Sequence, residues 1–159
     1  MNGANTMDPM RKMLSEHVFF KNFDRTLILE LVECASVATF GPDTMIYRED
    51  EPADSFLLIR KGRVAVEIFV EGRGPLTIQT VYPGDVLGWS WLFPPYRRRF
   101  DARAVEATET IVLDGLMLRE KAENNNRLGY ELLKRFSKVV VDRLQAASVK
   151  LLDIYGHHA

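Results

Sequence analysis

The middle of the chain alternates short apolar runs with turn residues. From Ser36 onward, runs of roughly four to eight residues, rich in β-branched and aromatic side chains, are separated by Gly, Pro and Asp. Many such runs at regular spacing predict antiparallel strands closed into a barrel or jelly roll. The expected strands cover residues 37–40, 44–48, 55–60, 63–70, 76–82, 101–105 and 110–113.

Helical spacing replaces this pattern at both ends. Asp8 is a suitable N-cap and Pro9 a suitable first helical residue, so a helix is predicted over 9–16. A second helix is expected to start at Asp24. After Asp114 the spacing predicts a short helix over 116–123 and a long one over 127–155. The predicted fold class is therefore mostly β with flanking α. It is an antiparallel double-stranded β-roll (jelly roll) with N-terminal helices and a long C-terminal helix.

Three segments follow from these patterns. We expect an N-terminal segment over 1–18, the β-roll over 19–123 and the long helix over 124–159. The long helix carries apolar residues at spacings of three and four. They are Leu128, Leu132, Phe136, Val140, Leu144, Ala147 and Leu151, widened by Leu133, Val139, Val141 and Leu152. A helix of about 29 residues is about 43 Å long, which is longer than a small barrel. This favours a homodimer formed through the helix; the alternative is that the whole apolar surface packs intramolecularly.

Composition sets limits on function. The chain has 159 residues, 47% hydrophobic and 27% charged, and a formal net charge of −1. These values are ordinary for one globular domain. A net charge close to zero gives the protein as a whole no electrostatic attraction to nucleic acid or to an anionic membrane. No apolar run approaches the roughly 20 residues of a membrane span, and the N-terminus lacks a signal-peptide core. The single cysteine, Cys34, excludes an internal disulfide. We expect a soluble, cytoplasmic protein.

The sequence contains no recognisable set of catalytic or metal-ligating residues. The three histidines, His17, His157 and His158, lie outside the β region, although a metal-dependent jelly-roll enzyme needs clustered ligands on its strands. Neither of the glycine-rich phosphate-binding patterns, GxxxxGK[ST] and GxGxxG, occurs, and no pair of carboxylates stands out. We therefore expect no catalytic activity, no bound metal and no resident cofactor.

The most informative segment covers residues 84–104. It reads Gly84-Asp85-Val86-Leu87-Gly88, then an aromatic and proline-rich loop, then Arg98-Arg99-Phe100-Asp101-Ala102-Arg103-Ala104. This segment resembles the phosphate-binding cassette of the cyclic-nucleotide-binding domain family, whose bacterial prototype is the catabolite activator protein. The family pattern is approximately G-D-x-x-G-E-L followed by R-S/A-A-x-V-x-A. Segments 40–47, 53–59 and 61–66 match further family motifs in order, so the resemblance covers about 19–155.

The resemblance implies a regulatory, ligand-sensing module. It would bind a cyclic nucleotide, cAMP first, or a related anionic effector, and would signal through a separate partner protein. In such a cassette glycines let backbone N–H groups approach the phosphate, and an arginine neutralises it. The residues that carry over are Gly88, Trp89, Ser90, Arg97, Arg98, Arg99 and Ser148. Arg98 is the first choice for the arginine, with Arg99 and Arg97 as alternatives, and Ser148 matches a serine of the long helix that reaches the purine.

The chain departs from the family pattern at Trp89. The family has a glutamate there that accepts a hydrogen bond from the ribose 2′-hydroxyl, whereas an indole N–H only donates. Phe100 is also bulkier than the family residue. Together with Trp91, Phe93 and Tyr96 these form an aromatic cluster, which either stacks on a flat ligand or fills the pocket. The alternative function is therefore a structural or protein-interaction β-roll that binds no ligand.

Direct DNA binding is not expected. In transcription factors of the family a winged helix-turn-helix follows the long helix. Here the sequence ends at Ala159, four residues after Tyr155, which leaves no room for a recognition helix.

Overall fold

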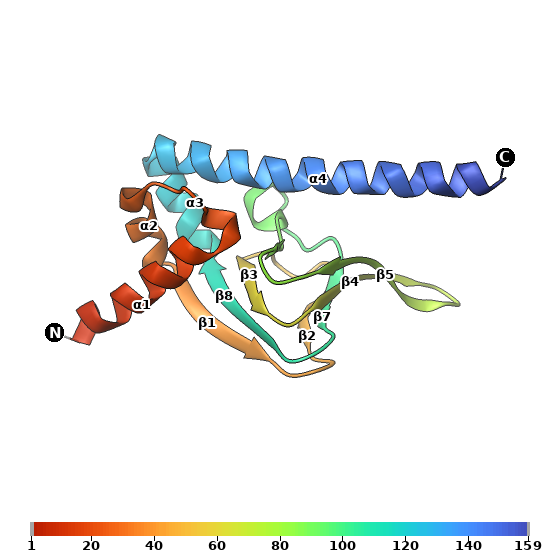
Figure 1. Cartoon of the computed structure of the whole chain (residues 1–159), viewed down its shortest axis with the longest axis horizontal. Coiled ribbons are helices and arrows are strands. Elements are labelled where there is room, and N and C mark those ends of the chain that lie inside the picture. Colours follow the sequence, from red (N-terminus) through yellow and green to blue (C-terminus); the bar gives the residue numbers. More distant parts are fainter. Residues whose placement is uncertain (1, 159) are drawn as a thin grey trace. The chain divides into compact units, whose positions relative to one another are not determined.

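A computed structural model describes the backbone of residues 2–158 and the side chains of residues 9–156. Figure 1 shows the order of the elements along the chain. The chain forms two compact units, the first ending at Lys121 and the second beginning at Ala122. Each unit is described separately below.

The N-terminal region is helical. It contains α1 (Asn2–Glu16), a short 3₁₀ turn η1 (Val18–Phe20) and α2 (Arg25–Val32). The predicted start of the first helix at Asp8-Pro9 is wrong, because α1 begins earlier and Pro9 lies inside it. An interior proline removes one N–H donor and crowds the carbonyl four residues earlier, but it leaves the other hydrogen bonds of the helix in place. The predicted cap of the second helix is confirmed: the Asp24 carboxylate accepts from the backbone N–H of Thr26 at 2.7 Å.

The β-roll consists of two antiparallel sheets. Among the described residues, one sheet has the strand order β1 (Ala35–Phe40), β8 (Thr108–Asp114), β3 (Ser55–Lys61) and β6 (Val86–Leu87). The other has the order β2 (Met45–Tyr47), β7 (Asp101–Ala104), β4 (Val64–Val70) and β5 (Gly74–Val81). These strands confirm the predicted fold class, and β6 is the one that the sequence pattern missed because it is only two residues long.

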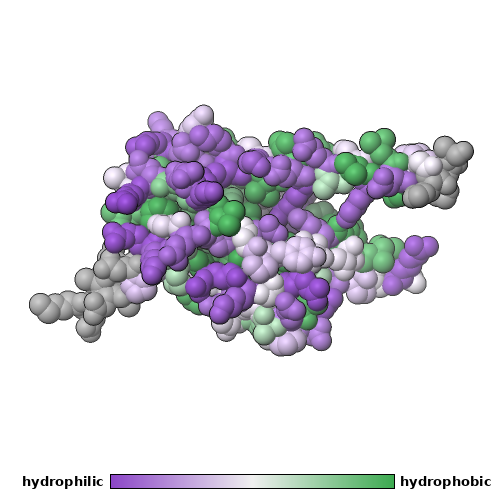
Figure 2. All heavy atoms as spheres, in the orientation of Figure 1, coloured by the Kyte–Doolittle hydropathy of each residue, from purple (hydrophilic) through white to green (hydrophobic). Residues whose placement is uncertain are grey.

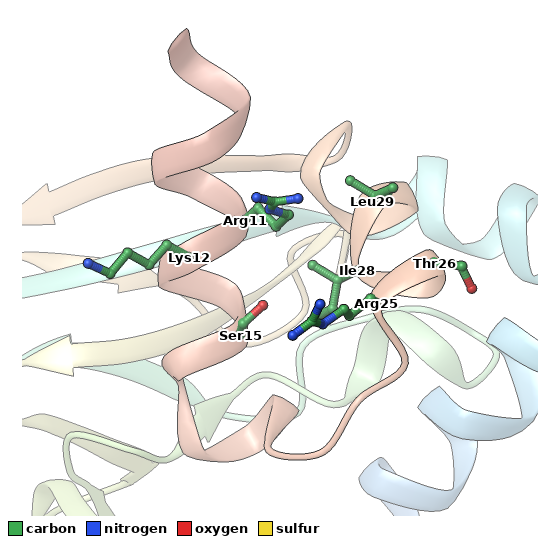
Figure 3. Close-up of a pocket in the computed structure, with 7 residues that line it drawn as sticks. All are labelled: Arg11, Lys12, Ser15, Arg25, Thr26, Ile28 and Leu29. Carbon is green, nitrogen blue, oxygen red and sulfur yellow. The ribbon is translucent and has the colours of Figure 1, made fainter. Parts of the chain in front are cut away.

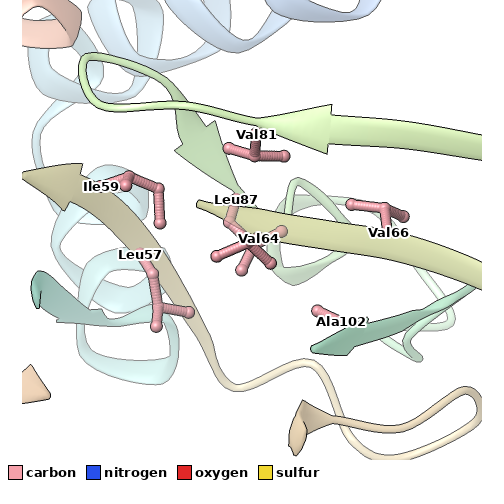
Figure 4. Close-up of a cluster of buried hydrophobic side chains, with 7 residues drawn as sticks. All are labelled: Leu57, Ile59, Val64, Val66, Val81, Leu87 and Ala102. Atoms are coloured by element: carbon pink, nitrogen blue, oxygen red, sulfur yellow. The ribbon is translucent and has the colours of Figure 1, made fainter. Parts of the chain in front are cut away.

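Aliphatic side chains from five strands fill the space inside the roll. Figure 4 shows this core, which consists of Leu57, Ile59, Val64, Val66, Val81, Leu87 and Ala102. The members of this core stand two residues apart on β3 and on β4, as the period of a strand requires. The residues between them, Leu58 and Ala65, are buried as well, so the other face of each of these strands is also covered. β6 contributes Leu87 to this core, so the loop that follows β6 starts from a fixed point.

His17 fastens the end of α1 to the β-roll. Its Nε2–H donates to the carbonyl of Ile59 at 2.9 Å, and its Nδ1 accepts from the backbone N–H of Phe19 at 3.1 Å. The side chain is 8% exposed, and burial lowers its pKa from the ordinary 6.5. The Nδ1 acceptor is available only while the imidazole is neutral.

We expect the stability of the domain to decrease as the pH falls through 6.5. The unfolded chain takes up the His17 proton at a higher pH than the folded chain does, so the contribution is complete above pH 6.5 and is lost below it. Urea unfolding between about pH 7.5 and about pH 5.5 measures this. His17→Gln should flatten the profile over that range; an unchanged slope would show that another group is responsible.

The remaining helices are α3 (Gly115–Asn124) and α4 (Asn126–His158). The predicted break between them is confirmed: the Asn125 side chain accepts from the backbone N–H of Leu128 at 3.2 Å. Along α4 the apolar residues fall into two groups. Leu128, Leu132 and Phe136 are at most 1% exposed. The apolar residues from Val140 onward that stand at helical spacing are exposed, and green side chains follow this part of α4 in Figure 2.

Candidate functional site

The loop between β6 and β7 forms the candidate site. β6 ends at Leu87, Gly88 follows with φ +89°, and a 3₁₀ turn η2 (Ser90–Leu92) comes next. The loop then contains a cis peptide bond between Pro94 and Pro95 and returns to β7. A positive φ favours glycine, which agrees with the glycine that the sequence places there.

Three backbone hydrogen bonds join this loop to the acidic turn between β2 and β3. Ala53 N–H donates to the carbonyl of Tyr96 at 2.8 Å, Arg98 N–H to Glu51 at 2.9 Å, and Asp50 N–H to Arg98 at 2.8 Å. The two segments therefore form a short ladder, and Arg98 takes part in two of its three bonds. This arrangement holds the backbone of Arg98 on both sides.

The Arg98 side chain turns inward and is 5% exposed. Its Nη2 donates to the carbonyl and hydroxyl oxygens of Ser55, at 2.8 and 3.1 Å. The guanidinium lies over the Tyr47 ring, 4.1 Å from the ring centroid. Gly88 lies directly against it, because a Cβ built at position 88 would stand 2.5 Å from Nη1. Only glycine leaves space for this side chain.

Two donors of this guanidinium are unused. Within the described part of the chain, Arg98 Nε and Nη1 are buried and have no hydrogen-bond partner. Burial lowers the pKa of Arg98, while Tyr47, Asp54 and Glu51 act in the opposite direction. Arginine nevertheless stays charged in proteins at neutral pH. The fold thus holds a buried positive charge with free N–H groups, which is an arrangement suited to an anion.

A hollow of about 650 Å³ opens beside Arg98. Its lining residues are Glu49, Asp50, Trp89, Pro95, Arg97, Arg98, Arg99 and Phe100. All three arginines of the predicted set therefore line one space, but only Arg98 is buried, whereas Arg97 and Arg99 are exposed. Arg97 Nη1 donates to the backbone carbonyl of Asp50 at 3.0 Å.

The two carboxylates of this hollow were missed by the sequence analysis. Glu49 and Asp50 belong to the acidic turn 49–52, which the sequence predicts as a turn next to the motif at 53–59 but does not connect with the arginine loop. Their position becomes visible once the turn pairs with the arginine loop, as the bridge between Pro52 and Arg97 shows. They supply hydrogen-bond acceptors beside the cationic group.

The predicted aromatic cluster divides between core and hollow. Trp91 is fully buried and stacks on Phe56, with ring centroids 5.0 Å apart. Trp89 is half-buried, contacts Phe93 edge-to-face at 6.1 Å, and lines the hollow together with Phe100. Part of the cluster is thus structural, and part is available to a ligand.

The other predicted residues lie as follows. Ser90 begins η2, is 7% exposed and is not among the residues that line the hollow. Ser148 is exposed on α4, and its hydroxyl donates to the carbonyl of Leu144 at 2.9 Å. Among the residues described, no group of three or more His, Cys, Asp and Glu side chains is placed to hold a metal ion. The helices in that part of the chain include none that combines the length and apolarity needed to cross a membrane.

The site is thus a β-roll loop in which a buried arginine lies against the glycine that precedes a 3₁₀ turn. The model of the cyclic nucleotide-binding domain family matches residues 37–125, more than half of the chain, and the protein belongs to this family. The expected family resemblance is confirmed. No curated protein matches the sequence.

Solved structures give the same result for the fold. A protein from Geobacter metallireducens GS-15, described as a cyclic nucleotide-binding protein, is 27% identical with a TM-score of 0.74, covering 87% of this chain and 98% of that one. A cyclic nucleotide-binding domain from Methylobacillus flagellatus is 23% identical with a TM-score of 0.79, covering 92% and 85%. The regulatory domain of Toxoplasma gondii protein kinase A, solved with cAMP, is 17% identical with a TM-score of 0.70, covering 89% and 52%.

Proposed function

We propose that this protein is a non-catalytic regulatory module that binds a cyclic nucleotide, or a related phosphate-bearing effector, on Arg98. The observation that carries this proposal is the buried guanidinium with Nε and Nη1 unpaired in the described part of the chain. An unpaired buried charge destabilises a fold by several kcal/mol. A bound phosphate would take up the free donors and offset that cost, since arginine–phosphate pairs form two parallel hydrogen bonds.

The remaining groups of the hollow fit a nucleotide. Trp89 and Phe100 offer aromatic surface for a flat base, and Arg97 and Arg99 add positive charge at the solvent side. The volume of about 650 Å³ lies within the range of small-molecule sites. Glu49 and Asp50 are the acceptors that this hollow offers to a ligand hydroxyl, because the Trp89 indole has none. Signalling would then pass to a separate partner protein.

Isothermal titration of the full chain with cAMP, cGMP and cyclic dinucleotides tests this proposal. We expect saturable heat with at least one of them. A comparison with 2′-deoxy-cAMP tests the acceptors: because the Trp89 indole has none, weaker binding of the deoxy compound would report a hydrogen bond from the 2′-hydroxyl to Glu49 or Asp50. If none of these compounds gives heat or raises the melting temperature, the chain is instead an interaction module that binds no ligand.

We further propose that α4 forms a homodimer through its exposed apolar residues. Positions at alternating spacings of four and three make one continuous row on its surface, which is the spacing of a two-stranded coiled coil. The row consists of Leu133, Ser137, Val140, Leu144, Ala147, Leu151 and Ile154. Leu144 is 65% exposed and Leu151 56%, which is unusual for leucine unless a partner covers it.

Leu144→Arg is expected to convert the dimer to a monomer. A charge at the centre of the row meets its own copy across the interface, so both desolvation and repulsion oppose association. Light scattering after gel filtration should give about 36 kDa for the parent chain (two chains of 18.2 kDa) and about 18 kDa for the variant. Gln145→Arg, one residue along and off the row, is the matched control and should stay dimeric. A parent chain that elutes as a monomer would contradict this proposal.

A further inference from the structure

A second hollow lies between α1 and α2. It has a volume of about 580 Å³, and none of its lining residues lines the hollow at Arg98. The lining residues are Arg11, Lys12, Ser15, Arg25, Thr26, Ile28 and Leu29. Figure 3 shows Arg11 and Ser15 on α1 facing Arg25 and Ile28 on α2, with Lys12 extending away from α2.

The described residues that line this hollow carry charge of one sign. Three of them are cationic, and none of the described lining residues is Asp or Glu. The whole chain has 21 basic and 22 acidic residues, so this excess is a local feature of the two helices. Asp24, which precedes Arg25, caps α2 by accepting from the N–H and hydroxyl of Thr26, at 2.7 and 2.5 Å. Lys12 forms a long ion pair with Glu16 at 4.0 Å, between two exposed side chains.

The floor of the hollow is apolar. Ile28 is 2% exposed and belongs to the core, whereas Leu29 is 44% exposed and offers its side chain to whatever occupies the space. The hydroxyls of Ser15 and Thr26 complete the lining. A small inorganic anion would use only the charged part of this surface. A hydrocarbon body carrying one or two negative groups would use both parts, because apolar burial adds to charge attraction.

We propose that the α1–α2 hollow is a second ligand site, which binds an organic anion with an apolar body. Arg11 and Arg25 hold the anionic group from opposite helices, and Leu29 with the edge of Ile28 contacts the hydrocarbon. Because the two hollows share no residue, this site is independent of the function proposed for Arg98. A ligand bridging α1 and α2 would fasten the N-terminal helices to each other.

Fluorescence titration with 1-anilinonaphthalene-8-sulfonate tests the site, because this probe combines a sulfonate with an aromatic body. We expect saturable enhancement with the full chain at low salt. Arg11→Glu combined with Arg25→Glu should weaken the probe affinity at least about tenfold, and Leu29→Ser should also weaken it. These side chains are exposed, so the variants should keep the parent circular dichroism spectrum and melting temperature.

Two matched controls separate this site from other binding. Arg73→Glu reverses an exposed charge on the β4–β5 turn and should leave the affinity unchanged. The titrations are repeated in an Arg98→Leu background, which removes the cation that would hold the probe in the hollow between β6 and β7. Probe affinity that survives the Arg11/Arg25 reversal would overturn the proposal. Affinity that is lost in Arg98→Leu but not in the reversal variant would also overturn it, because the probe would then occupy the hollow between β6 and β7.

Discussion

Arg98→Leu is expected to weaken cyclic nucleotide binding at least about 100-fold while leaving the stability of the free protein almost unchanged. Removing a buried charge that pairs with a ligand phosphate costs about 2–5 kcal/mol of binding free energy. Removing the same charge from the free protein eliminates an unpaired buried ion and leaves the Ser55 carbonyl without its Nη2 donor, two effects of opposite sign. Titration calorimetry and thermal unfolding of the same preparations measure both quantities.

Arg97→Leu and Arg99→Leu are the matched controls for this change. Both residues line the same hollow but are exposed, so each should reduce affinity by less than about tenfold. A pattern in which Arg99→Leu abolishes binding and Arg98→Leu does not would show that Arg98 has a structural role only. Loss of folding in Arg98→Leu would lead to the same conclusion, since the guanidinium would then be required by the protein itself.

Gly88→Ala is expected to lower both affinity and stability. Its φ of +89° is unfavourable for alanine, and the added Cβ would stand 2.5 Å from Arg98 Nη1, so the guanidinium must move. We expect a loss of about 1–3 kcal/mol in the free energy of unfolding and at least about tenfold weaker nucleotide binding. Chemical unfolding and titration calorimetry measure the two effects.

Gly72→Ala is the matched control, which separates the effect of backbone strain from the effect of displacing the Arg98 guanidinium. Gly72 has a similar φ of +83°, but a Cβ there would meet nothing within 4 Å. It should therefore lower stability through backbone strain alone and leave nucleotide affinity at the parent value. If the two variants bind equally well, contact with Arg98 does not control the site.

Much of the fold follows from the sequence pattern, and the failures have identifiable causes. The strands that carry Leu57 and Val64 are short apolar runs bounded by turn residues, and the strand that carries Ala102 alternates, so their positions are predictable. β6 was not predicted, because its two residues, Val86 and Leu87, are too few to show a strand period. The start of α1 was misplaced because Asp8-Pro9 has the residue types of a helix start, although the helix accommodates Pro9 in its interior.

The candidate site was predictable in its arginines but not in its partners. The glycine and the arginine triplet stand within one segment, and the resemblance of that segment to the family's phosphate-binding cassette implies an anion site. The contribution of Glu49 and Asp50 depends on pairing between segments some fifty residues apart, which a one-dimensional pattern does not contain. Likewise, the burial of Trp91 and the partial exposure of Trp89, two residues away, depend on which side of η2 each faces.

The contacts of Arg98 suggest a way to detect a ligand bound in the hollow beside it. Ser55 belongs to β3 in one sheet, and Tyr47 to β2 in the other, so a single side chain touches both sheets of the roll. A ligand that holds the Arg98 side chain in place would therefore restrain local unfolding of β2 and of β3, which belong to separate sheets. Amide hydrogen exchange should slow together in β2 and in the first half of β3, although these strands lie in different sheets.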